Sequence, residues 1–247
     1  MNKFRKTYFK AVVLAAGTGS RLNEITRHIP KGMIRINGKY IFEIILENIA
    51  KSGIREVIFV VGYKRRQFVP LIQRASERLG INVTFITNTI YKKTNTMYSF
   101  WLAREYLDSA FIYLHGDLIF EGKMLAEFMA SPSGNAILVD TKFPLDWDDA
   151  MKVISHGDGI KYMSKSITIS EMDGIAIGIY KFDKLGAKKL LQIVDKLIKK
   201  RVDKSWVSEA INILAKDTKI NLEKNTRYSW VDVDNLADLK MASNIYK

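Results

Sequence analysis

The chain alternates strand-length apolar runs with segments of helical periodicity, and this alternation limits the folds that it can adopt. Four runs have the length and composition of buried strands: KAVVLA (10–15), REVIFVVG (55–62), INVTFIT (81–87) and AFIYLHGD (110–117). Segments at 42–52, 65–79 and 95–107 lie between or beside them and carry apolar residues at helical spacing. The alternation predicts an α/β protein with a doubly wound, Rossmann-like mixed sheet flanked by helices.

Beyond residue 117 the pattern changes to short strand-like runs joined by short turns. These runs are NAILVD (135–140), MKVIS (151–155), GIKYMSK (159–165) and GIAIGIYKF (174–182). Two helical stretches (184–200 and 205–216), the strand-like KINLEK and YSWVDV, and a helix from about Asn235 complete the chain. We therefore expect an antiparallel layer that extends the sheet, within one domain over residues 1–247.

Charge and composition narrow the class of partner. The chain has 39 Lys and Arg against 26 Asp and Glu, a formal charge of +13, which favours polyanionic partners such as nucleic acid, anionic membranes or phosphorylated small molecules. It has no cysteine, which excludes disulfides, thiolate nucleophiles and Cys-ligated zinc. The longest apolar runs, VIFVV and AILV, are too short to span a membrane, and MNKFRKTYFK lacks the apolar core of a secretory signal. We expect a cytoplasmic protein with no transmembrane segment.

The first strand ends in a glycine loop, LAAGTGSRL. A dinucleotide-binding loop needs a third glycine where Leu22 stands, and a Walker loop needs a Gly-Lys-Ser/Thr that is missing. Gly17, Gly19 and Ser20 nevertheless offer backbone N–H groups to phosphate oxygens, and Arg21 could add charge-assisted hydrogen bonds. Without the charged residues that follow, a structural turn between strand and helix would explain the glycines equally well.

The longer stretch LAAGTGSRLNEITRHIPKGMIRINGK carries a specific resemblance. It resembles the signature of the nucleotidyltransferases that couple a nucleoside triphosphate to a phosphorylated small molecule: L-A-A-G-x-G-x-R-L, then P-K, then a hairpin and a helix. It is similar in particular to cytidylyltransferases acting on phosphocholine or inositol phosphate, and more distantly to sugar-1-phosphate nucleotidyltransferases. The match continues through Asp117, Lys165 and WVDVD, and so covers nearly the whole chain.

The resemblance implies a nucleotide-diphospho-sugar transferase-like fold. Residues 1–117 would mainly bind the nucleotide, and residues 118–247 would mainly bind the acceptor. Catalytic roles would fall to Arg21, Lys31 and Lys165, with Lys165 on the acceptor's phosphate. The nucleotide-binding residues would be Leu14, Ala15, Ala16, Gly17, Thr18, Gly19, Ser20, Arg21 and Lys31.

An acidic pair in this family holds Mg²⁺, and the chain offers three carboxylates at strand ends. Asp117 ends a predicted central strand, where open α/β sheets bind ligands. Asp232 and Asp234 follow another strand in YSWVDVDN, and their spacing does not decide which of them would join Asp117. Either one could instead cap the final helix, because Asp is favoured at helix caps.

The acceptor is the least constrained part of the prediction. Asn95, Thr96 and Tyr98 stand at a helix N-terminus suited to polar recognition, although phosphocholine-type members tend to have a second asparagine where this chain has Thr96. Further polar candidates are Asp140, Asp149 and Glu209; together these groups slightly favour a phosphorylated polyol such as inositol phosphate. Five aromatic residues could instead cage the cation of phosphocholine: Trp101, Phe143, Trp147, Tyr162 and Trp206.

The hypothesis is thus a Mg²⁺-dependent nucleotidyltransferase that joins an NTP, most consistent with CTP, to a phosphorylated small alcohol and releases pyrophosphate. The alternatives are a sugar-1-phosphate uridylyl-, thymidylyl- or guanylyltransferase, a non-catalytic regulatory protein, or a nucleic-acid-binding protein with this fold. The intact set of Arg21, Lys31, Asp117 and Lys165 speaks against the regulatory alternative, and we expect no nucleic-acid partner. His28, His115 and His156 show no metal-ligand spacing, and structural roles are predicted for them.

Overall fold

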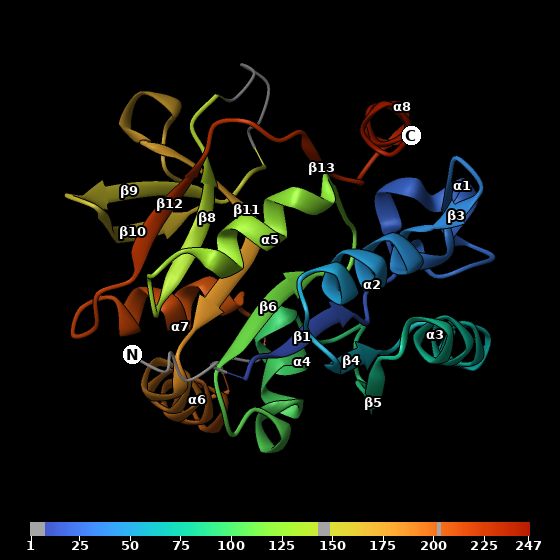
Figure 1. Cartoon of the computed structure of the whole chain (residues 1–247). Coiled ribbons are helices and arrows are strands. Elements are labelled where there is room, and N and C mark those ends of the chain that lie inside the picture. Colours follow the sequence, from blue (N-terminus) through green and yellow to red (C-terminus); the bar gives the residue numbers. More distant parts are fainter. Residues whose placement is uncertain (1–7, 143–148, 202–203) are drawn as a thin grey trace, which may run out of the picture.

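A nine-stranded mixed sheet organises the protein (Figure 1). The structure is a computed structural model that describes residues 8–142, 149–201 and 204–247. In spatial order the strands are β5 (Asn82–Thr87), β4 (Glu56–Val61), β1 (Lys10–Ala15), β6 (Phe111–His115), β11 (Gly174–Phe182), β8 (Ala136–Asp140), β12 (Asn221–Asn225), β10 (Gly159–Ser164) and β9 (Lys152–His156). The α/β fold with a mixed sheet flanked by helices is confirmed.

The first four strands of this order are parallel. β1 pairs with β4 and β6, and β4 pairs with β5, so that in chain order the strands run third, second, first, fourth. This is the order of half a Rossmann fold. The direction of winding reverses between β1 and β6, and ligands bind such sheets at the carboxyl ends of the two strands that flank the reversal.

The rest of the sheet is mostly antiparallel, as predicted. β11 runs antiparallel to β6, β8 and β9, and β10 runs antiparallel to β9 and β12. The prediction is wrong for one pair, because β12 is parallel to β8. A parallel pair needs a long crossover, and α6 (Lys184–Lys199) and α7 (Val207–Leu214) lie between these two strands in the sequence.

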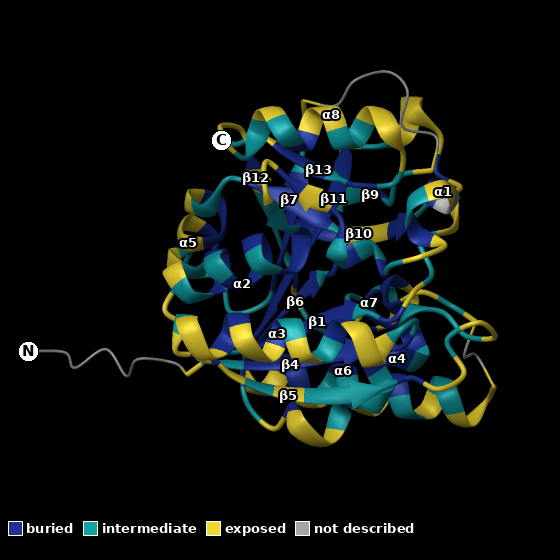
Figure 2. Cartoon of the chain, turned by 90° about the vertical axis from the view of Figure 1, so that its right-hand side faces the viewer, coloured by how far each residue is buried: buried dark blue, intermediate teal, exposed yellow. Residues whose placement is uncertain are grey.

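Different helices cover the two faces of the sheet, and β1 shows why. Its side chains alternate, so Ala11 and Val13 enter one core while Val12 and Leu14 enter the other. The first core is completed by α2 (Ile41–Lys51), α3 (Arg65–Leu79), α5 (Gly122–Ala130) and α8 (Leu236–Ile245). The second is completed by α4 (Thr96–Leu102), α6 and α7. Figure 2 shows the buried residues on the central strands and the exposed ones on the outer helix faces.

The remaining elements are short. Around the glycine loop and the predicted hairpin lie α1 (Asn23–Thr26), β2 (Arg35–Ile36) and β3 (Lys39–Tyr40), and the 3₁₀ turns are Ser20–Leu22, Lys31–Met33, Arg104–Tyr106 and Ile169–Glu171. The Asn37-Gly38 pair in MIRINGKYIF predicts a hairpin, and the structure confirms it, with φ of 46° and 89° at these two residues. Among the described helices, none combines the length and the apolar character that crossing a membrane requires.

A small second sheet was not predicted, although the site depends on it. β7 (Leu118–Phe120) pairs antiparallel with β13 (Trp230–Asp232), and α5 follows β7. In this register Asp232 lies opposite Leu118, and the Val233 N–H donates to the Asp117 carbonyl at 3.1 Å. The pairing therefore brings the end of the chain beside the carboxyl end of β6.

Candidate active site

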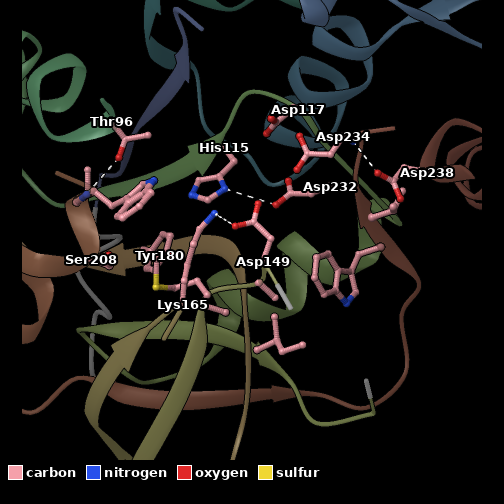
Figure 3. Close-up of a pocket in the computed structure, with 18 of the residues that line it drawn as sticks. Thr96, His115, Asp117, Asp149, Lys165, Tyr180, Ser208, Asp232, Asp234 and Asp238 are labelled. Atoms are coloured by element: carbon pink, nitrogen blue, oxygen red, sulfur yellow. Dashed lines mark hydrogen bonds and ion pairs between the residues drawn. The ribbon is translucent and has the colours of Figure 1, made fainter. Parts of the chain in front are cut away.

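Two adjoining cavities open at the carboxyl ends of β1 and β6. One, of about 460 Å³, is lined by the glycine loop and is called the loop cavity below. The other, of about 360 Å³, is lined by Tyr113, Tyr180, Trp206 and Trp230 and is called the aromatic cavity (Figure 3). The residues that line both are Arg21, Asp117, Asp149, Lys165, Trp206 and Asp234. The charged residues therefore stand where the two cavities meet.

Tight backbone contacts shape the loop cavity. Gly19 has a φ of +65°, and the Thr26 hydroxyl donates to its carbonyl at 2.8 Å. Gly116 approaches β1 so closely that a Cβ there would lie 2.5 Å from the Leu14 carbonyl oxygen. Of the predicted nucleotide-binding residues, those that line the loop cavity are Leu14, Ala15, Gly17, Gly19, Ser20, Arg21 and Lys31; Ala16 and Thr18 do not line it.

A chain of alternating charges crosses the site. The Lys31 ammonium donates to Asp117 at 2.5 Å and to Asp234 at 2.7 Å. Arg21 donates to Asp234 at 2.9 Å and also pairs with Asp149. Asp149 in turn accepts from the Lys165 ammonium at 2.8 Å. The three predicted catalytic cations are thus brought together, each held by at least one carboxylate.

The network fixes the charge states of its most buried members. Burial alone would lower the pKa of Lys31, but Asp117 and Asp234 raise it above its ordinary value. Burial would raise the pKa of Asp117, but the Lys31 ammonium lowers it below the usual range. Near neutral pH these two groups are therefore an ammonium and a carboxylate.

The geometry separates the two candidate metal ligands, Asp232 and Asp234. One ligand atom each of His115, Asp117 and Asp232 lie within 4.8 Å of one another, whereas Asp234 pairs with Lys31 and Arg21. Asp232 Oδ1 is buried and has no hydrogen-bond partner in the part of the chain that the structure describes. Burial, followed by the charge of Asp117, raises the pKa of Asp232.

These residues could hold a divalent cation, because two carboxylates and an imidazole are suitable ligands and a buried carboxylate oxygen is left without a partner. Neither Asp232 nor Asp234 caps the final helix. Asn235 does so instead, since its side chain accepts from the N–H groups of Ala237 and Asp238.

The aromatic cavity combines ring faces with an excess of carboxylates. Tyr113 and Tyr180 stack with centroids 5.0 Å apart, and the Lys165 ammonium lies 5.2 Å from the centre of the Trp206 ring. The indole N–H of Trp230 donates to Asp140 at 2.5 Å. The lining includes two basic side chains, Arg21 and Lys165, and five carboxylates: Asp117, Asp149, Asp232, Asp234 and Asp238.

Some of the predicted acceptor residues line one of the cavities, and the others line neither. Thr96, Asp149 and Lys165 line the aromatic cavity, while Asn95 lines the loop cavity and caps α4 by accepting from the Thr96 N–H at 2.8 Å. Tyr98, Asp140 and Glu209 line neither cavity. Tyr98 packs on Trp101, Asp140 holds the Trp230 indole in place, and Glu209 is exposed on the first turn of α7.

The aromatic residues of the site were only partly anticipated. Of the candidates for a choline cage, Trp206 lines the cavity, whereas Trp101 and Tyr162 do not; Phe143 and Trp147 lie outside the described residues. Sequence reasoning missed His115, Tyr180, Trp230 and Ser208. Trp230 had a usable signal, since it lies two positions before Asp232 and therefore on the same face of a strand.

Lys31 should stabilise the fold through the carboxylates that it separates. The Lys31 side chain is 12% exposed, so Lys31→Met removes the cation between Asp117 and Asp234 and leaves Asp234 paired with Arg21 alone. The free energy of unfolding, measured by urea denaturation, should fall by about 1–3 kcal/mol, less than for a fully buried pair because Asp234 is 41% exposed. Adding Asp234→Asn should recover part of that loss.

The matched control is Lys39→Met, which removes the 44% exposed cation paired with Glu47 but leaves Glu47 the hydrogen bond that the Tyr246 hydroxyl donates, and should cost at most about 1 kcal/mol. Equal losses for Lys31→Met and Lys39→Met would contradict the role of Lys31. A Lys31→Met/Asp234→Asn variant less stable than Lys31→Met alone would contradict it as well.

Comparison with known proteins identifies the family. The model of the nucleotidyl transferase family matches residues 10–145. A CMP-5'-(3-aminopropyl)phosphonate synthase of Streptomyces rubellomurinus is 37% identical over 128 residues, which are 52% of this chain and 20% of that protein. A choline-phosphate cytidylyltransferase of Streptococcus pneumoniae is 26% identical over 242 residues, 96% of this chain and 98% of that enzyme.

Solved structures support the fold independently. The inositol-1-phosphate CTP transferase from T. maritima superposes with a TM-score of 0.82 at 20% identity, over 99% of this chain and 98% of that one. The family model matches more than half of the residues, within the segment that carries the glycine loop, Lys31 and Asp117. The chain therefore belongs to the nucleotidyl transferase family.

Proposed function

We propose that the protein transfers the cytidylyl group of CTP to a small phosphorylated or phosphonate compound that carries a cationic amine, with release of pyrophosphate and dependence on Mg²⁺. The observation that carries the proposal is the junction of the two cavities. A loop suited to phosphates meets an acidic, aromatic cavity at a shared group of cations: Arg21 and Lys165 line both cavities, and Lys31 lines the loop cavity beside them.

The loop cavity would hold the triphosphate. The backbone of Gly17 to Ser20 offers N–H groups at the end of β1, and Arg21 and Lys31 supply positive charge. Asp234 and Asp149 pair with these cations, so phosphate oxygens would take the place of carboxylate oxygens. The cations are thereby held near their working positions before the nucleotide arrives, which reduces the cost of ordering them.

The reaction needs little acid–base chemistry from the protein. An oxygen of the acceptor's phosphate, already ionised, attacks the α-phosphorus of CTP; the new P–O bond forms as the bond to pyrophosphate breaks. Lys165 would orient the attacking phosphate, and Arg21 and Lys31 would stabilise charge on the triphosphate. Mg²⁺ held by Asp117 and Asp232 would neutralise charge on the nucleotide phosphates.

The lining of the aromatic cavity supports a cationic amine over a polyol. Aromatic faces attract an ammonium group, whereas two of the polar groups expected to bind a polyol, Asp140 and Glu209, do not line the cavity. The two relatives agree, because choline and the aminopropyl group both carry a cationic nitrogen, and both names specify a cytidylyl product or donor.

We also propose that residues 1–117 mainly bind the nucleotide and that residues 118–247 mainly bind the acceptor. Most residues of the loop cavity come from positions 1–117, and most residues of the aromatic cavity come from positions 118–247. Each cavity nevertheless takes some residues from the other half. The proposed nucleotide and acceptor halves therefore share one site between them.

A pyrophosphate-release assay tests the proposed function. Each of the four NTPs is incubated with Mg²⁺ and one acceptor: phosphocholine, phosphoethanolamine, 3-aminopropylphosphonate, inositol 1-phosphate or glucose 1-phosphate. We expect release with CTP and an amine-bearing acceptor. Release only with inositol 1-phosphate or glucose 1-phosphate would overturn the acceptor class, and no release in any combination would overturn the proposed reaction.

Lys165 should act on the acceptor and not on the nucleotide. Lys165→Met removes the ammonium that would hold the acceptor's phosphate, so kcat/KM for the acceptor should fall by roughly 10²–10³-fold. CTP affinity measured by calorimetry without acceptor should change by less than about threefold, a small fraction of that loss. Lys161→Met is the matched control, because Lys161 is exposed on β10, the strand that ends one residue before Lys165. Equal kcat/KM values for the two variants would rule out this role.

A further inference from the structure

We propose that His115 is a third ligand of the metal site, beside Asp117 and Asp232, and that this site binds Mn²⁺ in the absence of nucleotide through one imidazole nitrogen and two carboxylates. The inference builds on the metal site of the proposed function. It concerns a residue to which the sequence assigned only a structural role. Its test reads metal binding directly and does not require catalysis.

The local structure places His115 among the carboxylates. His115 is the last residue of β6, two positions before Asp117, and the pairing of β13 with β7 brings Asp232 to the same point. One ligand atom from each of the three lies within 4.8 Å of the others. Figure 3 shows the imidazole of His115 directed toward Asp232, with a dashed line between them, and Asp117 beside Asp234.

The space around the imidazole depends on a glycine in the neighbouring strand. Gly178 of β11 has a φ of +90°, and a Cβ there would lie 2.7 Å from His115 Nδ1. The rings of Tyr113 and Tyr180 flank the imidazole at centroid distances of 5.5 and 6.1 Å. Because the flanking ring faces are apolar, the polar groups that face Nδ1 are the carboxylates.

The His115–Asp232 pair does not satisfy its own polar atoms. His115 Nδ1 lies 3.8 Å from Asp232 Oδ2, which is too long for a good hydrogen bond. The other oxygen, Asp232 Oδ1, is buried without a partner among the described residues. A cation between the imidazole and the carboxylates would satisfy both, whereas a purely structural histidine would leave the buried oxygen unpaired.

The donor set decides which cation fits. Mg²⁺ prefers oxygen ligands and keeps much of its water, so Asp117 and Asp232 would suffice for it. Imidazole nitrogen is a ligand of transition metals, and Mn²⁺ is the transition metal that, like Mg²⁺, suits carboxylate ligands, so it serves as the probe of this site. His115 as a third ligand should therefore raise the affinity of the site for Mn²⁺ more than its affinity for Mg²⁺.

Pulsed EPR of the metal-stripped protein loaded with Mn²⁺, without nucleotide, tests the proposal. We expect a ¹⁴N coupling from a directly bound imidazole. His115→Gln should abolish the coupling and weaken Mn²⁺ binding at least about tenfold, while Mg²⁺ affinity changes by less than about threefold. His156→Gln is the matched control, because His156 is exposed at the end of β9, and it should keep both the coupling and the affinity.

Three results would overturn the proposal: no Mn²⁺ binding to the nucleotide-free wild-type protein, bound Mn²⁺ without a ¹⁴N coupling, or a coupling that persists in His115→Gln. The first two are read from the wild-type chain and do not depend on whether a variant folds. Pyrophosphate release with Mg²⁺ is assayed in the same preparation. Release without the coupling refutes His115 alone, and coupling without release refutes the proposed function alone.

Discussion

The site depends on one electrostatic arrangement, a row in which cations and carboxylates alternate. Its members in order are Lys165, Asp149, Arg21, Asp234, Lys31 and Asp117. Three cations so close together would repel one another without the intervening carboxylates. Under the proposed function, phosphate oxygens would replace these carboxylates, because they offer the cations similar hydrogen bonds and more charge. The network holds the three cations close together, as binding a triphosphate would require.

The backbone brings these charges together from distant parts of the sequence. Lys31 follows the glycine loop, Asp117 follows β6, and Asp234 follows β13, so Lys31 and Asp234 are separated by 203 residues. The β7–β13 ribbon makes the connection, because its register fixes Asp232 and Asp234 beside the end of β6. The parallel sheet supplies the glycine loop and Asp117, and the ribbon supplies the carboxylates that complete the site.

The sequence predicted what local chemistry determines. The glycine loop, the Asn37-Gly38 hairpin and the bounds of α3 each depend on residues close together in the chain, and each was predicted correctly. Two features depend on segments that are far apart in the chain: the parallel pairing of β12 with β8, and the β7–β13 ribbon. No local sequence pattern specifies such pairings.

The same distinction explains the outcome for the site residues. Spacing left Asp232 and Asp234 equivalent, and the strand register then directed Asp232 to Asp117 and Asp234 to Lys31. Glu209 lies on the exposed side of α7. The polarity of a residue does not predict whether its helix turns it toward the site or toward solvent. His115 was missed because its polar neighbour, Asp232, is 117 positions away in the sequence.

We propose that the phosphates of CTP replace carboxylates on Lys31 and Arg21, and a crystal structure with a non-hydrolysable CTP analogue and Mg²⁺ would test this exchange. We expect phosphate oxygens on Lys31 and Arg21, with the Lys31–Asp234 and Arg21–Asp149 pairs opened. A nucleotide bound with its phosphates elsewhere, and with both ion pairs intact, would contradict it.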